Sequence, residues 1–305
     1  KNSLIPAVAY NPDDGFKIGI KNVYRVNGFN RNPFTSKHTL TAGFYFATNG
    51  FDVKYKGEFA GVLKNFNLMV GAKFTSPNFS ENFFGFGNET VNNDDDLGLD
   101  FNRVRISHIG VDIGAAKFGR FGSYFDYKAR FEGIQVDKDS DRFIGNPVFE
   151  SGDPEFFKRK YFVSADATYR YESYDVDVNP TNGMKFEING GITANAEDFD
   201  RTFGYINPYL GFYNSLITSR KLVLKTSAQA QINLGDDYEF YQSAQLGQNT
   251  GLRGYRNQRF SGKRSFATSA DLRYSFNQFK TGVLPIQIGI FGGFDLGRVW
   301  LSDND

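Results

Sequence analysis

The chain has 305 residues, a formal net charge of +1 and no cysteine. These values exclude a disulfide framework and thiol chemistry, and they give no indication of a nucleic-acid partner. No stretch approaches the roughly 18–20 apolar residues of a membrane-spanning helix. However, 17% of the residues are aromatic and 33 are glycine, which are the residue types of strands, tight turns and interfacial girdles.

Apolar and polar side chains alternate along nearly the whole chain, as in β-strands with two different faces. In residues 51–60, for example, Phe51 and Tyr55 share one face, and Lys54 and Glu58 share the other. The pattern predicts about thirteen strands. In chain order they lie near residues 4–9, 14–27, 38–48, 51–60, 65–76, 103–118, 121–136, 159–174, 183–195, 202–217, 221–235, 264–278 and 284–300.

Two kinds of all-β protein fit this alternation, a soluble sheet protein and a membrane barrel. The periodic segments exceed the roughly 5–6 residues usual in soluble sheets, and their apolar face is rich in Ala, Gly, Tyr and Phe. The three longest connections, 77–102, 137–158 and 236–263, all follow odd-numbered strands. In an up-and-down barrel they emerge on one side, which is the bacterial outer-membrane layout. We therefore predict an all-β, transmembrane, antiparallel up-and-down β-barrel in the outer membrane of a Gram-negative bacterium.

The alternation also predicts which side chains face lipid and which face the lumen. Pro208, within the tenth strand, cannot donate to the ladder and marks a weak point there. The residues expected to face lipid are Phe51, Tyr55, Phe125, Phe131, Leu222, Leu224 and Leu272, and those expected in the lumen are Lys54, Lys56, Lys128, Arg130 and Gln229.

The strand at 103–118 breaks the pattern. Val104 and Ile106 lie on one face, whereas the apolar residues from Ile109 onward lie on the other. A slip of one residue in phase predicts a β-bulge near Ser107–His108.

The strand count predicts an incomplete barrel. Single-chain bacterial barrels close with an even number of strands, and unpaired backbone groups in lipid cost several kcal/mol each. We therefore expect residues 1–305 to form one barrel domain that lacks its last strands, supplied after Asp305 or by another chain. The opening KNSLIPAVAYNPDDG has no secretory-signal pattern, so we also expect a processed or incomplete chain.

A candidate site lies in the third long connection and the two strands after it. An arginine in a water-excluded lumen needs carboxylate partners, and its planar fork suits two of them. Asp271 and Asp295 lie on the polar faces of their strands, which should point into the lumen. Arg256 and Arg259 are expected on wetter parts of the loop. The predicted loop-to-lumen anchor comprises Leu252, Arg253, Gly254, Tyr255, Asp271 and Asp295.

Leu252-Arg253-Gly254-Tyr255 resembles the (V/I/L)-R-G-(F/Y) signature of the BamA/TamA/FhaC superfamily, the bacterial surface antigen family. SADLRY at Asp271 is similar to its acidic strand-twelve motif, and IFGGFDLGRVW at Asp295 is similar to its F-x-D-x-G-x-V-W. The resemblance implies sixteen strands and a sixth extracellular loop folded into the lumen. The opening LIPAVAYNPDDGFKIG looks more like the barrels that terminate phosphoesterase or patatin-like chains, notably in Bacteroidetes, and no POTRA repeat is visible.

Other candidate sites carry weaker signals. His38 and His108 are the only histidines and have no ligand spacing. The acidic run Asn92–Asp96 could hold a divalent cation, but it lacks an EF-hand pattern and fits a solvated loop better. No nucleophile elbow, P-loop or dinucleotide fingerprint is present. We expect no catalytic residue, no metal and no cofactor, and therefore not an enzyme.

The resemblance implies a role in insertion or translocation of proteins at the outer membrane. The expected partners are outer-membrane lipid, nascent outer-membrane or secreted proteins, and other subunits of an outer-membrane complex, with no nucleic acid. The first strand, which contains Pro6, would form one side of a seam that opens to substrate strands. Two alternatives stay open: an anchor or pore for a phosphoesterase- or patatin-like enzyme on the same chain or a partner, and a passive porin.

Overall fold

The structure is a computed structural model that describes residues 1–11, 15–28, 31–139, 141–146, 155–282 and 284–302. Fourteen strands form its main sheet; β6 pairs at the side of β7, which leaves thirteen strands along one antiparallel path. The path runs through β1 (Asn2–Asn11), β2 (Gly15–Gly28), β3 (Arg31–Tyr45), β4 (Gly50–Leu63), β5 (Phe66–Thr75), β7 (Arg103–Phe118), β8 (Ser123–Val136), β9 (Lys160–Tyr174), β10 (Gly183–Asn195), β11 (Thr202–Ser215), β12 (Leu222–Leu234), β15 (Arg264–Ser275) and β18 (Gly289–Trp300).

The remaining elements are short and lie in connections. They are β6 (Ser80–Asn82), α1 (Asp94–Leu97), η1 (Phe143–Gly145), η2 (Phe240–Gln242), β13 (Ala244–Leu246), η3 (Gln248–Thr250), β14 (Phe260–Gly262), β16 (Phe279–Lys280) and β17 (Pro285–Ile286). None of the described helices is long and apolar enough to cross a membrane.

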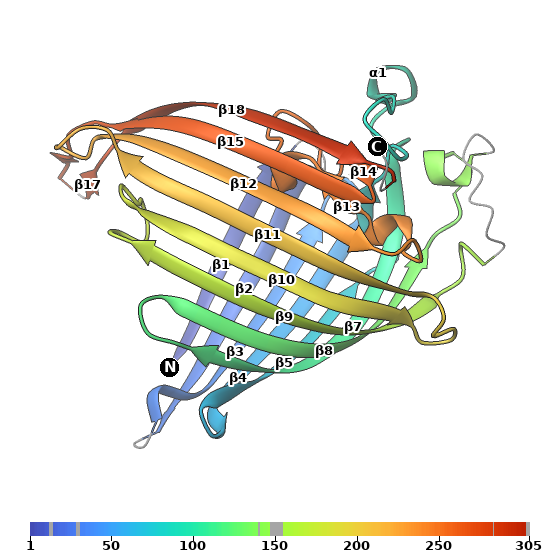
Figure 1. Cartoon of the computed structure of the whole chain (residues 1–305), viewed down its shortest axis with the longest axis horizontal. Coiled ribbons are helices and arrows are strands. Elements are labelled where there is room, and N and C mark those ends of the chain that lie inside the picture. The colour runs from blue at the N-terminus through green and yellow to red at the C-terminus, as the bar shows by residue number, and fades with distance from the viewer. Residues whose placement is uncertain (12–14, 29–30, 140, 147–154, 283, 303–305) are drawn as a thin grey trace.

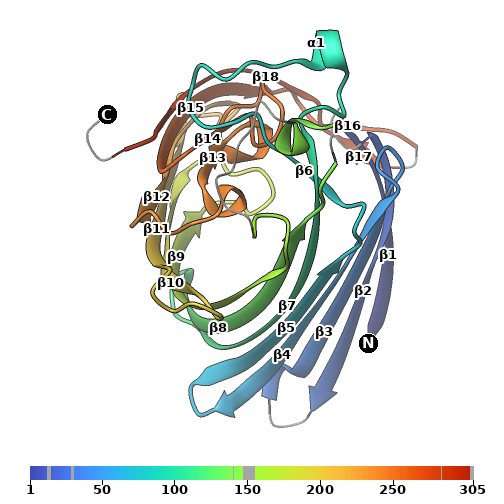
Figure 2. The ribbon, with the colours of Figure 1, turned by 90° about the vertical axis from the view of Figure 1, so that its right-hand side faces the viewer.

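The main sheet curls around a central lumen (Figures 1 and 2). Each strand pairs with the next strand of the path, as in an up-and-down barrel. Within the described residues the barrel is not closed, because β1 and β18 stand at the two ends of the strand order. The predicted fold class, strand number and strand order are confirmed.

The two faces of the wall differ as the alternation predicts. On β2, Ile18 and Ile20 are 44% and 48% exposed on the outer face, whereas Lys21 lines a cavity inside. Leu224 lies opposite Leu272, which is also exposed. An apolar outer face and a polar lumen are the arrangement that lipid and water select in a membrane barrel.

The three long connections meet at one rim of the barrel. The backbone N–H of Phe143 donates to the Phe101 carbonyl at 2.8 Å, and Asn82 Nδ2 donates to the Asn257 carbonyl at 3.0 Å. The turns at 119–122 and 216–221 lie at the other ends of the strands. The predicted separation of long loops from short turns is therefore confirmed; that the long loops face the cell exterior stays a prediction.

An apolar cluster joins the long connections to the strand ends beneath them. The rings of Phe83 and Phe240, from the first and third connections, lie 4.7 Å apart. Burial of so many large side chains is the main force that holds the loops together. Its buried members are Phe83, Val104, Ile106, Ile134, Val136, Ile144, Phe156, Phe162 and Phe240.

The β-bulge predicted near Ser107–His108 is absent. The register of β7 with β8 runs without a shift from Ile106 opposite Val136 to Phe118 opposite Tyr124. The apolar residues change face because their surroundings change: the start of β7 packs under the loops, and the rest faces outward. The prediction was wrong because alternation reports polarity and not the direction of a side chain.

Pro208 behaves as predicted. It pairs with Ile188 of β10, but the ladder between β11 and β12 passes from Ile206 directly to Tyr209. Proline has no backbone N–H to donate, so β12 loses a partner at this point.

Candidate functional site

The third long connection, residues 235–263, folds back into the lumen instead of projecting from the rim (Figure 2). Its short strands β13 and β14 pair with each other. Side chains on the inner face of β12 hold it: Gln231 Oε1 accepts from the Gln245 backbone N–H at 2.9 Å, and Asn233 Nδ2 donates to the Gln242 carbonyl at 3.0 Å. Polar residues that alternation assigns to the lumen therefore bind the loop backbone.

A small apolar cluster seats the loop on the barrel wall. Leu246 and Leu252 of the loop are buried against Ala267 of β15 and Val299 of β18. At Gly297, a Cβ would lie 3.0 Å from Leu246 and 3.2 Å from Leu252. The glycine in the F-x-D-x-G-x-V-W pattern is thus explained by the close approach of the loop.

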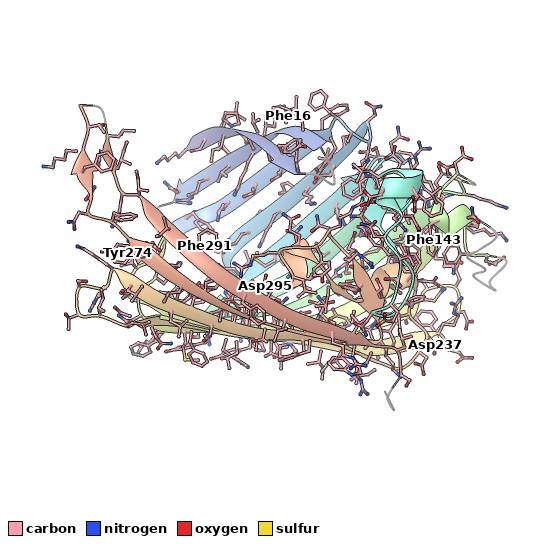
Figure 3. All side chains as sticks on the ribbon, turned by 90° about the horizontal axis from the view of Figure 1, so that it is seen from above. Phe16, Phe143, Asp237, Tyr274, Phe291 and Asp295 are labelled. Carbon is pink, nitrogen blue, oxygen red and sulfur yellow. The ribbon has the colours of Figure 1, made fainter. Side chains whose placement is uncertain are left out.

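Arg253 binds two carboxylates on neighbouring strands. Its Nε donates to Asp295 Oδ2 at 2.9 Å, and its Nη2 donates to Asp295 Oδ1 at 2.6 Å and to Asp271 Oδ1 at 2.6 Å. The Arg253 backbone N–H also donates to Asp295 Oδ2, at 3.0 Å. Asp295 is labelled on β18 in Figure 3. The contact to Asp295 is the bidentate fork geometry that distinguishes arginine from lysine.

The carboxylates raise the pKa of the Arg253 guanidinium, Asp295 most strongly and Asp271 next, through the hydrogen bonds just described. Lys225 of β12 lies 3.6 Å from Asp271 and adds a second positive charge. A Cβ at Gly293 would lie 2.0 Å from Asp271 Oδ1. Only glycine at 293 leaves room for Asp271 to turn toward Arg253.

The structure thus brings Arg253, Asp271 and Asp295 together, with Leu252 buried beside them. Tyr255 takes no part in this contact: its side chain is half exposed and its ring lies 5.2 Å from Phe260. A Cβ at Gly254 would meet no atom within 4 Å, whereas Gly251 adopts φ +101°. The sharp turn before the arginine therefore depends on Gly251, not on Gly254.

The expectation of a water-excluded lumen at Arg253 was wrong. The Arg253 side chain is 42% exposed, although its two partners are 7% and 12% exposed. The lumen beside the loop is open enough to hydrate the guanidinium. The carboxylates, not the arginine, are the buried members of this site.

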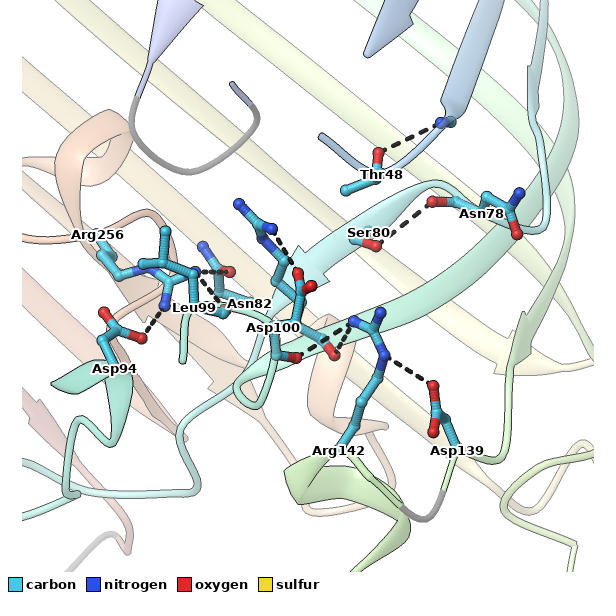
Figure 4. A network of polar contacts seen from close by, with 12 residues as sticks. Thr48, Asn78, Ser80, Asn82, Asp94, Leu99, Asp100, Asp139, Arg142 and Arg256 are labelled. Carbon is cyan, nitrogen blue, oxygen red and sulfur yellow. Dashed lines mark hydrogen bonds and ion pairs between the residues drawn. The ribbon is translucent and has the colours of Figure 1, made fainter. Parts of the chain in front are cut away.

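Arg256 and Arg259 were expected on wetter parts of the loop, and they are instead well buried. Arg256 forms an ion pair with Asp94 of α1, and its Nη2 donates to Asn82 at 2.9 Å (Figure 4). Arg259 Nη1 donates to Thr90 Oγ1 at 2.6 Å. Both arginines are enclosed because the first long connection packs over the third.

Sequence reasoning missed how the first long connection contributes. Asn88 pairs with the backbone of Val299 in both directions: its Nδ2 donates to the carbonyl at 2.8 Å, and its Oδ1 accepts from the N–H at 3.0 Å. Gln258 Oε1 accepts from the Asn82 backbone N–H at 2.7 Å. No periodic signal marks such contacts, because they join residues far apart in the chain.

The weaker candidate sites are not brought together. His38 lies on the outer face, 2.8 Å from Tyr55 Oη. His108 lies in the lumen, between Lys73 and Glu132. Within the described ranges, no group of three or more His, Asp or Glu side chains has the geometry to hold a metal ion.

The sequence model of the haemolysin secretion/activation protein family ShlB/FhaC/HecB matches residues 126–305. This match covers 180 of the 305 residues, which is more than half of the chain. The chain belongs to this family. It is accordingly an outer-membrane β-barrel of the BamA/TamA/FhaC superfamily from a Gram-negative bacterium, as the resemblance at Arg253 implied.

Solved structures share the fold. The crystal structure of BamA from Haemophilus ducreyi lacking POTRA domains 1–3 matches this family member with a TM-score of 0.68 and 13% sequence identity. The match covers 98% of this chain and 58% of that BamA chain, so the chain spans less than two thirds of that relative. No curated protein sequence matches the chain.

Proposed function

We propose that this barrel takes part in the insertion or translocation of proteins at the outer membrane. The observation that carries the proposal is the third long connection, which enters the lumen and is held there by Arg253 between Asp271 and Asp295. A passive porin works through an open, water-filled lumen, which such a loop would narrow. The family's printed name, secretion and activation of haemolysin, points in the same direction.

The first strand offers a place for a substrate strand. β1 pairs with β2 over ten positions, and β18 pairs with β15. Within the described chain β1 has a second edge of free backbone groups, which an extended segment can pair with by β-augmentation. Pro6 removes one donor from β1, so a partner there is held less tightly.

The loop would keep the wall at β15 and β18 rigid. Arg253 ties the loop to both β15 and β18, and Asn88 ties the first connection to β18 as well. A substrate strand would then be received at the freer edge of β1, while the loop braces the wall at β15 and β18. We propose outer-membrane lipid, nascent outer-membrane or secreted proteins, and further subunits of a complex as the partners of this single barrel domain.

Depletion of the full-length protein in its host tests the proposal. We expect a defined set of outer-membrane or secreted proteins to disappear from their destination, as measured by quantitative proteomics of membrane and medium. Wild-type protein should restore the set, and Asp295→Asn should restore it poorly, because the loop loses its main partner. An unchanged proteome, with loss only of small-solute uptake or of an enzyme activity, would contradict the proposal.

A further inference from the structure

A cavity of about 500 Å³ occupies the short-turn end of the lumen. Phe118 and Tyr124, which flank the short turn between β7 and β8, place it at that end. Five of its lining residues are cationic and three are carboxylates. They are Lys21, Lys37, Lys56, Lys128 and Arg170 against Glu58, Asp126 and Glu187.

The carboxylates in this cavity are already engaged by neighbours. Each has a donor or a cation close by, and Glu58 also lies opposite Lys37 in register. The five cations of the cavity outnumber its three carboxylates by two. Glu58 accepts from Asn67 Nδ2 at 2.9 Å, Asp126 accepts from Tyr124 Oη at 2.6 Å and lies 3.5 Å from Lys128, and Glu187 lies 3.1 Å from Lys185.

Three lysines of the cavity have no such polar partner. Among the described residues, Lys21, Lys37 and Lys56 have no hydrogen bond and no ion pair through their side chains. They come from three successive strands, β2, β3 and β4, and Lys37 and Lys56 lie two residues apart in register, with Lys56 opposite Thr39. Like charges so arranged repel one another, and a concave wall of one sign focuses its field on the space in front.

On the inner face of β2, β4 and β5, the lysines nearer the long loops do have polar partners. Lys17 and Lys54 both bind Asp52, at 3.8 and 3.1 Å, and Lys73 Nζ lies 2.7 Å from His108 Nδ1. On the described inner face of β2 to β5, the lysines outside the cavity therefore have polar partners, whereas Lys21, Lys37 and Lys56 have none.

We propose that Lys21, Lys37 and Lys56 form a docking site for an acidic stretch of polypeptide at the short-turn end of the lumen. The inference rests on the proposed function and names the chemistry of the segment that the lumen receives. Three lysines on separate strands suit the sparse charge of a peptide, and the same cavity is lined by three carboxylates. They would repel a densely charged polyphosphate.

Fluorescence anisotropy with the full-length protein in detergent tests the site. The probe is a labelled, unstructured peptide with glutamate at every third position, and the comparison probes are its lysine counterpart and inorganic polyphosphate. We expect the triple variant Lys21→Gln, Lys37→Gln, Lys56→Gln to bind the acidic peptide on the order of ten-fold more weakly. Lys56→Gln alone should weaken binding by about two-fold. This single variant replaces the triple variant in the measurement if the triple variant does not fold.

A matched control removes three charges from the same rim outside the cavity: Lys64→Gln, Lys117→Gln, Arg120→Gln. Lys117 lies on the outer face opposite Phe125, and the other two lie in short turns. The control should bind as wild type does. Equal weakening in both triple variants, unchanged binding in the cavity variants, or tighter binding of polyphosphate than of peptide would overturn the inference.

The binding measurement does not depend on transport. If the depletion experiment succeeds while the cavity lysines prove irrelevant to peptide binding, the docking site is wrong and the proposed function stands. If the lysines bind the peptide while depletion leaves the proteome unchanged, the proposed function is wrong.

Discussion

Replacing Leu210 with arginine should strongly impair folding into lipid bilayers. Leu210 lies near the middle of β11, on the outer face and opposite Ala228 of β12. A charge at the bilayer midplane of a barrel costs about 2–4 kcal/mol. Folding yield into liposomes, read by heat modifiability on gels, measures the effect.

Two further arginine substitutions serve as controls for Leu210→Arg. Asn207→Arg places the same charge in a lumen cavity on the same strand, where water hydrates it, and it should be tolerated. Leu224→Arg lies on the outer face but close to the short-turn end of β12, where the cost falls to about 0–1 kcal/mol. Equal yields of the three variants would contradict the assignment of the outer face to lipid.

Arg253→Ala should destabilise the folded barrel by about 2–3 kcal/mol. The value lies below the ~3–5 kcal/mol of a fully buried ion pair, because the guanidinium is partly exposed while its two carboxylates are buried. Arg253→Lys should restore only part of the loss, since an ammonium group cannot reproduce the fork. Proteolysis and heat modifiability in one detergent measure the differences.

The control for Arg253→Ala has to be an exposed arginine, which excludes the buried Arg256 and Arg259. Arg120 lies in an exposed short turn at the opposite rim, and Arg120→Ala should change stability very little. If Arg253→Ala and Arg120→Ala proved equally stable, the anchoring role proposed for Arg253 would be wrong.

Alternation in the sequence predicts the barrel wall well, because lipid and water impose opposite polarity on alternate residues. The strand predicted at 103–118 is observed as Arg103–Phe118, and the one at 183–195 as Gly183–Asn195. The third strand begins at Arg31 rather than near residue 38. Its first residues have no clean alternation, and the register with β2 shifts among them, from Gly28 opposite Arg31 to Val26 opposite Ser36.

The loops could not be predicted in the same way. Their structure depends on contacts between distant parts of the chain, such as Arg256 with Asp94 and Phe83 with Phe240. Local patterns contain no information on these pairs. This is why burial of Arg256 and inward packing at the start of β7 were both mispredicted.

The Arg253 site could be predicted from the sequence, but for a different reason. Its members lie on consecutive elements, and Asp271 and Asp295 come from adjacent strands whose inward faces are fixed by alternation. Once the loop is assumed to enter the lumen, few carboxylates remain within reach of the arginine. The seating of the loop on Gly297 and its attachment through Asn88 were seen only in the structure.

The position of the third connection inside the barrel is tested most directly by disulfide trapping in outer membranes. The chain has no cysteine of its own. Leu252→Cys combined with Gly297→Cys should form a disulfide, because Leu252 Cδ2 lies 3.2 Å from the Cβ position at 297 and the shorter cysteine at 252 leaves room for a side chain there. Leu252→Cys combined with Gly292→Cys should not, since Gly292 lies opposite the outward-facing Leu272 and a Cβ there meets no atom within 4 Å. A gel shift reversed by reductant in the first pair alone is the predicted result. No shift in the first pair, or an equal shift in both, would contradict a loop seated in the lumen.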